Sequence, residues 1–236
     1  MPRLIGDGEL TSSDVVANNT MNRERGLGGV NSYTRELGFD PAGWLGGRSG
    51  APGWLDLCSG EGRALAEAAL RLPAASVLTG VDLVGPLAAR PALPPGAARL
   101  ELVTAAEADW VPERAYDLIT CVHGLHYLGD QLGVIARAAG RLVPDGRFAA
   151  HFDPDSVRRA DGSSAARPVL AALRAAGFEY RARRHLLVLD GARALRLPFA
   201  YLGADPAAGP NYTGQPAVAS YYRAASTESP EGSPGR

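Results

Sequence analysis

The stretch from Gly53 to Leu72 constrains the fold most, because an apolar run, a glycine turn and a helical pattern follow one another directly. The run "GWLDLC" (53–58) is typical of a buried strand, and "GEGRALAEAALRL" (60–72) places its apolar residues on one helical face. Gly60 and Gly62 permit the tight turn between the two elements. This succession is typical of an open α/β sheet, in which ligands bind at the carboxyl ends of the strands.

The same alternation continues along the chain. Further strands are predicted at 76–83, 99–105, 116–122 and 146–152, and helices at 130–143 and 167–177. Two more strand-like runs follow, joined at Asp190-Gly191, a dipeptide that favours a hairpin. The pattern predicts an α/β protein with a Rossmann-like, doubly wound, mostly parallel seven-stranded sheet and an antiparallel terminal hairpin.

The ends of the chain differ from this alternating part. In residues 1–50, Val30, Tyr33 and Leu37 have helical spacing after a glycine-rich approach, which predicts an N-terminal arm with a helical lid. Residues 51–225 form the predicted Rossmann-like domain. Residues 226–236 are rich in Ser, Pro and Gly and are predicted to be a disordered tail.

Composition and charge exclude several classes of function. The chain has 236 residues and a net charge of −1, so a clustered basic surface for nucleic acid is not expected. The apolar runs fall short of a membrane span, and the N-terminus lacks the apolar core of a signal peptide. Two cysteines make no disulfide framework. We therefore expect a cytoplasmic protein without nucleic-acid or membrane partners, and a homo-oligomer remains open.

Asp82 ends the second predicted strand, roughly 20 residues beyond the glycine turn, where nucleotide folds place a ribose-binding acid. The turn lacks the three glycines of a dinucleotide site and the Lys-Ser/Thr pair of a phosphate loop. Glu61 would also repel a pyrophosphate. A cationic or neutral ligand with a ribose is therefore favoured.

With these features, residues 50–200 resemble the class I S-adenosylmethionine-dependent methyltransferases. "DLCSGEG" (56–62) matches the family signature Asp-x-Gly-x-Gly-x-Gly, with Cys58 in place of its first glycine. The resemblance implies that S-adenosylmethionine is the cofactor, that Asp82 binds its ribose and that Leu83 packs on its adenine. The implied cofactor-binding residues are Asp56, Ser59, Gly60, Gly62, Asp82, Leu83, Ala106 and Glu107.

One position departs from that family. Ala105 stands where an aspartate is usual, so adenine recognition would shift to Glu107, Asp109 or main-chain groups. The stretch "LHYLGD … LVPDGRF" also resembles the family's region between its fourth and fifth strands.

His123 and His126 follow the fourth predicted strand and would face the crevice beside the first strand. Each could be a general base, a group that orients the substrate, or a structural residue that bonds nearby backbone. We predict orientation, with His123 nearer the methyl group and with Tyr33 and Glu36 as alternates for accepting a late proton. The histidines and cysteines show no metal-ligand spacing, so no metal is expected.

The acceptor side must be completed outside the sheet. The segment from 199 to 222 is rich in glycine, proline and tyrosine, which suits a partly apolar pocket, although a loop packed over the sheet edge is the alternative. The predicted substrate-binding residues are Tyr127, Asp153, Tyr201, Asn211, Tyr212 and Gln215.

These features predict an enzyme that methylates a small aromatic or apolar molecule at nitrogen, oxygen or an electron-rich carbon such as an indole position, in natural-product biosynthesis. The alternatives are an RNA or protein methyltransferase, which the charge disfavours, and a non-methylating cofactor-binding member such as a cyclase or regulator.

Overall fold

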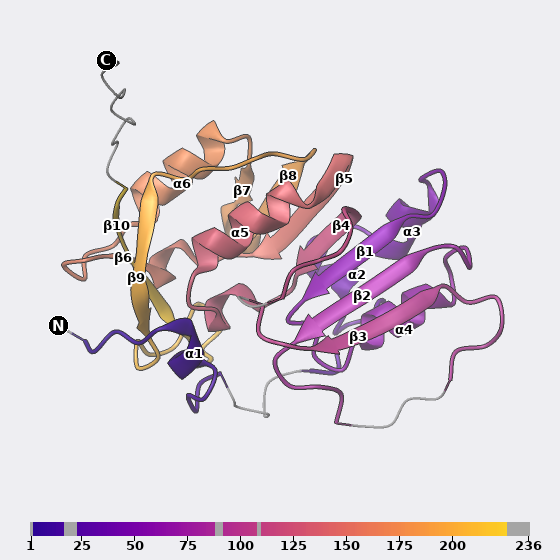
Figure 1. The fold of residues 1–236 in the computed structure, drawn as a ribbon, viewed down its shortest axis with the longest axis horizontal. Helices are drawn as coiled ribbons and strands as arrows, with labels where there is room; N and C mark the ends of the chain where they lie inside the picture. Colours follow the sequence, from indigo (N-terminus) through magenta and orange to yellow (C-terminus); the bar gives the residue numbers. More distant parts are fainter. Residues whose placement is uncertain (1, 17–22, 88–91, 108–109, 226–236) are drawn as a thin grey trace, which may run out of the picture.

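The computed structural model describes residues 2–16, 23–87, 92–107 and 110–225, and its main sheet has seven strands (Figure 1). They are β1 (Gly53–Leu57), β2 (Val77–Asp82), β3 (Arg99–Thr104), β4 (Tyr116–Cys121), β5 (Leu142–His151), β7 (Glu179–Arg181) and β8 (Leu186–Asp190). Their order is β3-β2-β1-β4-β5-β8-β7, and only the pairs that involve β8 are antiparallel. The predicted doubly wound sheet is confirmed.

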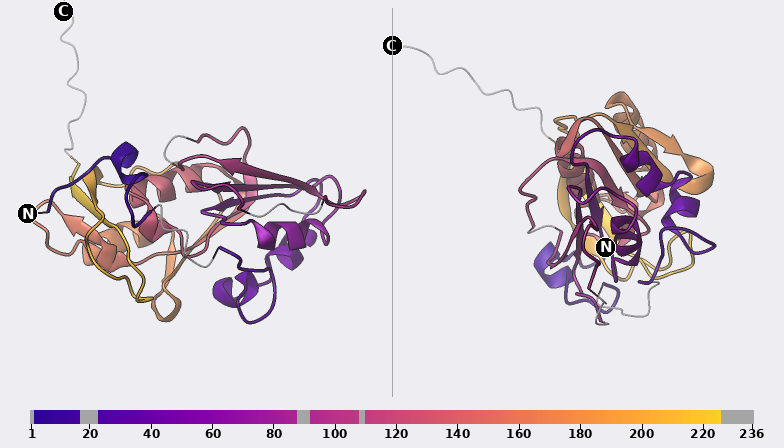
Figure 2. Two further views of the ribbon diagram at one scale, coloured as in Figure 1. Left: turned by 90° about the horizontal axis from the view of Figure 1, so that it is seen from below. Right: turned by 90° about the vertical axis from the view of Figure 1, so that its right-hand side faces the viewer.

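Helices cover both faces of this sheet. On one face lie α2 (Tyr33–Leu37), α3 (Pro41–Gly46) and α4 (Arg63–Ala69), which gather on one side of the sheet in Figure 2. On the other face lie α5 (Gln131–Gly140) and α6 (Ala166–Ala175). Successive residues of a strand point to opposite faces, so Trp54 packs with α2–α4 whereas Leu55 packs with α5.

The antiparallel hairpin is present, but its turn was predicted at the wrong place. It joins β7 to β8 through a 3-10 turn at Ala182–Arg184, and β8 also pairs with β5. Gly191, which follows β8, donates its backbone N–H to Gly146 of β5. The chain then leaves the sheet, because its next strand, β9 (Phe199–Asp205), belongs to a second sheet.

That second sheet, which the sequence did not predict, has three strands in the order β6-β10-β9. β10 (Ala219–Ala224) lies in the middle, parallel to β6 (Val157–Arg159) and antiparallel to β9. Figure 1 shows it at the end of the molecule opposite β3. Three tyrosines of the segment 199–222, which was predicted to be a loop, therefore lie in strands: Tyr201 in β9, and Tyr221 and Tyr222 in β10.

The N-terminal segment is attached at two places. Ile5 exchanges backbone hydrogen bonds with Ala204 of β9, beside the short helix α1 (Asp7–Leu10). In α2, Tyr33 and Leu37 are buried in the core, whereas Val30 lies outside any helix and is 80% exposed. Movement of residues 1–50 as a lid stays a prediction, and the burial of α2 restricts it. The predicted tail, 226–236, lies outside the described residues.

None of the helices in the described part of the chain has the length and apolarity needed to cross a membrane.

Candidate functional site

The glycine turn lies between β1 and α4, at the carboxyl edge of the sheet. Cys58, Gly60 and Gly62 all have positive φ angles, of 56°, 59° and 60°. This left-handed conformation favours glycine, which explains the glycine pattern of the turn. Cys58 adopts it with a side chain, and its thiol donates to Glu107.

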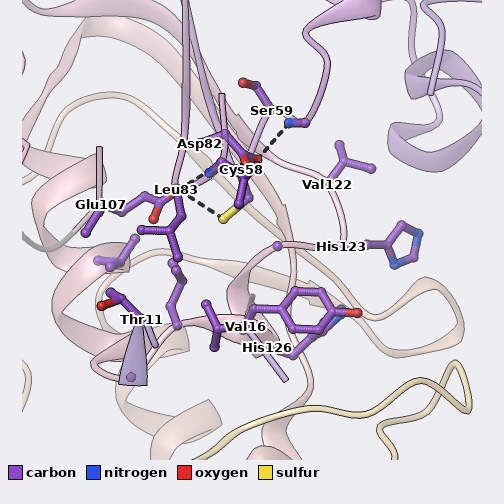
Figure 3. Close-up of a pocket in the computed structure, with 18 of the residues that line it drawn as sticks. Thr11, Val16, Cys58, Ser59, Asp82, Leu83, Glu107, Val122, His123 and His126 are labelled. Atoms are coloured by element: carbon purple, nitrogen blue, oxygen red, sulfur yellow. Dashed lines mark hydrogen bonds between the residues drawn. The ribbon is translucent and has the colours of Figure 1, made fainter. Parts of the chain in front are cut away.

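β1 and β4 are neighbours in the sheet although β2 and β3 separate them in sequence, so the strand order reverses between them. Ligands of open α/β sheets bind at such a reversal. A cavity of about 490 Å³ lies there, bordered by the turn after β1, the end of β2 and the segment after β4 (Figure 3).

Most of the predicted cofactor residues line this cavity. They are Ser59, Gly60, Asp82, Leu83, Ala106 and Glu107. Asp82 accepts hydrogen bonds from the backbone N–H groups of Gly60 (2.8 Å) and Val84 (3.0 Å). Gly62 lies outside the cavity lining and caps α4, where a Cβ would contact Leu102.

Asp56, which the family resemblance implies as a cofactor-binding residue through water or directly, is also outside the cavity lining. It is fully buried and accepts hydrogen bonds from the hydroxyls of Tyr33 (2.7 Å) and Thr120. Burial raises the pKa of Asp56 to about 7, and the negative charge of Asp82 acts in the same direction. Asp56 therefore attaches α2 to the sheet beneath the turn, and Tyr33, whose hydroxyl is bonded to Asp56, lines the cavity.

Glu107 occupies the predicted adenine end of the cavity. Its carboxylate accepts a hydrogen bond from the backbone N–H of Cys58 at 3.2 Å. Burial raises the pKa of Glu107 to about 7. Ala105 supplies no polar side chain, and Asp109 lies outside the described residues.

All four histidines of the chain lie in one cluster of ring contacts, of which His123 and His126 line the other end of the cavity. His123 stacks on His151 with ring centroids 3.9 Å apart, and Tyr212 stacks on His185 at 3.8 Å. The Tyr212 hydroxyl lies 3.2 Å from His123 Nδ1 and links the two stacks.

His123 and Glu36 form the dyad that the sequence only suggested as separate candidates. His123 Nε2 lies 3.0 Å from Glu36 Oε2, and this hydrogen bond lowers the pKa of Glu36 to about 2. His123 also has a positive φ of 57°, which is uncommon for a residue with a side chain.

His126 lines the cavity but is almost completely buried. Burial lowers its pKa to about 3, and the charge of His123 acts in the same direction. Its Nδ1 has no hydrogen-bond partner among the described residues. His126 is therefore neutral near pH 7.

The predicted substrate-binding residues divide into two groups. Tyr127 and Gln215 line the cavity, and Tyr212 contacts His123 at its edge. The other three make structural contacts outside the cavity lining: Asp153 caps the turn at Pro154–Ser156, Tyr201 donates to Asp7, and Asn211 accepts from Thr213.

Sequence reasoning missed three residues of the site. Arg23 and Arg25 line the cavity from a segment without periodicity, and His151 ends β5. Arg23 donates to Asp82, and Arg25 donates to Glu36 at 3.0 Å. Of these three residues, only His151 had a signal in the sequence, because it lies at the end of a predicted strand.

Several known proteins are similar to part of this chain. The chain is 37% identical over 105 residues to trans-aconitate 2-methyltransferase of Methylobacterium radiotolerans, a match that covers 44% of this chain and 38% of that enzyme. Similar solved structures include an amino pentose methyltransferase of Micromonospora echinaspora involved in calicheamicin biosynthesis (TM-score 0.37, 23% identity, 51% of this chain and 50% of that one). Another is an N-methyltransferase of Bradyrhizobium japonicum (TM-score 0.46, 14% identity, 79% and 98%).

The chain thus spans half or less of the length of the first two relatives. A family model described as a methyltransferase domain matches residues 40–186, which is more than half of the chain and includes β1–β5. The chain therefore belongs to the family of methyltransferase domains.

Proposed function

We propose that this protein transfers a methyl group from S-adenosylmethionine to a small acceptor bound beside His123 and His126. The observation that supports this most is that one cavity is lined by Asp82 at one end and by the two histidines at the other. This arrangement separates a nucleotide end from an acceptor end.

The residues at the nucleotide end fit such a cofactor. Burial raises the pKa values of Asp56 and Glu107, and the charge of Asp82 acts in the same direction, so this end of the cavity disfavours a further anion. Asp82 would accept the ribose hydroxyls and Glu107 the adenine amine, while Leu83 packs on the ring. The cofactor supplies an electrophilic methyl group on a sulfonium.

At the acceptor end, His126 and His123 would orient the nucleophile and help exclude water. The volume of about 490 Å³ must hold both cofactor and acceptor, which favours a small molecule. Tyr33 and Tyr127 line the cavity, and such aromatic residues favour an aromatic or apolar acceptor such as a natural-product intermediate. The net charge of −1 disfavours RNA.

A small carboxylate is a second candidate acceptor. The name of the trans-aconitate enzyme points to this chemistry, and Arg25 and Arg137 line the cavity. A carboxylate oxygen is already deprotonated near neutral pH and would need no base.

The proposal is tested by calorimetry with S-adenosylhomocysteine and by mass analysis of candidate acceptors after incubation with S-adenosylmethionine. Binding should be weakened in Asp82→Ala and unchanged in Asp190→Ala. Asp190 is a matched control because it also ends a strand and also pairs with an arginine, Arg147, but lies outside the cavity lining. Absence of binding to the wild-type protein would refute the proposal.

A further inference from the structure

Glu36, His123 and His151 come from three different elements and converge. Glu36 lies in α2, His123 follows β4, and His151 ends β5. One possible ligand atom from each lies within 4.8 Å of the other two. The sequence argument against a metal considered only spacing along the chain, which does not reveal a cluster assembled by the fold.

We propose that these three side chains form a binding site for a divalent transition metal ion. Two imidazoles and one carboxylate are a donor set that suits zinc, iron(II), cobalt(II) and nickel(II). Magnesium and calcium prefer oxygen ligands alone, so they should not bind here.

The distances between the donor atoms support this assignment. Glu36 Oε2 lies 3.0 Å from His123 Nε2 and 3.5 Å from His151 Nε2. Ligands that each lie about 2.1 Å from a tetrahedral metal are separated from one another by about 3.4 Å. The three donors are close enough to converge, but the His123 and His151 rings stack with centroids 3.9 Å apart and an interplanar angle of 10°. At least one ring must therefore rotate before the in-plane lone pairs of both nitrogens meet at one ion.

The surroundings hold two of the ligands in position. Arg25 donates to Glu36 Oε1, which leaves Oε2 directed at the imidazoles. The Tyr212 hydroxyl contacts His123 Nδ1, so Nε2 is the nitrogen left for a metal. Arg25 also adds a positive charge beside the site, so we expect a lower affinity than that of a closed structural zinc site.

The site is partly open to ligands. His123 lines the main cavity, whereas His151 is 2% exposed. Three protein ligands leave at least one coordination position for water or an acceptor oxygen, as in catalytic rather than structural zinc sites. The metal site shares His123 with the proposed acceptor end, but metal binding is measured without methyl transfer, so either proposal can fail alone.

The competing explanation is that Glu36 only accepts hydrogen bonds from the two imidazoles. Titration of the metal-free full chain with cobalt(II) distinguishes the two, because nitrogen and oxygen ligands in a tetrahedral field give visible d–d absorption bands. We expect saturable bands at one equivalent, displaced by zinc and unaffected by excess magnesium. A thiolate charge-transfer band would instead indicate binding at Cys58 or Cys121 and would overturn the assignment.

Glu36→Gln and His123→Gln should each weaken cobalt binding by at least tenfold. His185→Gln is the matched control, since His185 belongs to the same aromatic cluster but not to the three donors, and it should bind as the wild type does. Circular dichroism verifies folding of each variant, and the wild-type melting temperature should rise with zinc, since a metal that binds only the native state stabilises it. Absence of bands and of thermal stabilisation in the wild type, or equal losses in all three variants, would overturn the proposal.

Discussion

Arg23 donates a hydrogen bond from Nη1 to Asp82 Oδ1 at 2.9 Å, and both side chains are largely buried. Its Nη2 also donates to the carbonyl oxygen of Val84. The carboxylate proposed to bind the ribose is therefore already paired with a cation from the N-terminal segment. Ribose binding at that oxygen requires Arg23 to move.

Asp82→Ala should weaken S-adenosylmethionine binding by about 1.5–3 kcal/mol, the usual contribution of hydrogen bonds to a charged group. Arg23→Ala should strengthen binding, because it removes the competing ion pair. The loss caused by Asp82→Ala should also be larger in the Arg23→Ala background. Calorimetry on the four proteins of this double-mutant cycle measures the coupling; additive effects would show that Arg23 and the ribose do not compete.

Leu37→Ala should destabilise the protein by about 2–5 kcal/mol, because Leu37 is fully buried and its truncation leaves a cavity. Val30→Ala is the matched control, since Val30 precedes the same helix but is exposed, and its effect should stay within about 0.5 kcal/mol. Urea unfolding measures both. A negligible loss for Leu37→Ala would mean that α2 is a detachable lid after all.

The α1 segment offers a better test of closure than α2 does. Asp7, Leu10 and Val16 line the cavity. Leu10 and Val16 pack in a small cluster with β9, separate from the core of the main sheet, and Asp7 accepts a hydrogen bond from Tyr201 of β9. Deleting residues 1–16 should therefore leave cooperative unfolding intact and raise the acceptor KM. An unchanged KM in the folded truncation would remove this segment from the acceptor site.

The sequence predicted the features that a short stretch of residues determines, and it missed the features that depend on contacts between distant segments. The alternation of strands and helices, the positive-φ turn at Gly60 and the acid at Asp82 are each visible within a short window. The second sheet is not, because β10 pairs with β6, more than 50 residues earlier in the chain. The Arg23–Asp82 and Glu36–His151 contacts join segments that no linear spacing relates.

Asp56→Asn should change how stability depends on pH. The folded-state pKa of Asp56 is about 7 and the ordinary value is 3.8, so the folded protein keeps a proton that the unfolded chain loses. Stability from this group is therefore fully present below about pH 4 and falls as the pH rises to about 7, by at most about 1.4 kcal/mol per pH unit.

The amide has no such proton to lose, so Asp56→Asn should flatten this fall and be relatively more stable at pH 8. Glu107 has a raised pKa of about 7 as well, so a residual slope of the same sign should remain. Denaturant unfolding at several pH values measures how the free energy of unfolding depends on pH in each protein. Identical slopes for wild type and variant would show that Asp56 ionises normally in the folded state.

His126 should orient the acceptor and not act as its base. Burial lowers its pKa to about 3, so at pH 6–9 it is neutral and a weak base. Its Nδ1 is buried without a partner in the described part of the chain, so the ring must turn to present that nitrogen to the acceptor. His126→Ala should raise the acceptor KM and lower kcat modestly, without changing the pH profile of methyl transfer. His126→Gln should restore part of the affinity, because the amide can also hydrogen-bond.

His123→Ala should likewise divide its loss between acceptor affinity and turnover. Normal acceptor affinity with a roughly thousandfold, pH-dependent loss of methyl transfer in either alanine variant would instead identify that histidine as the general base.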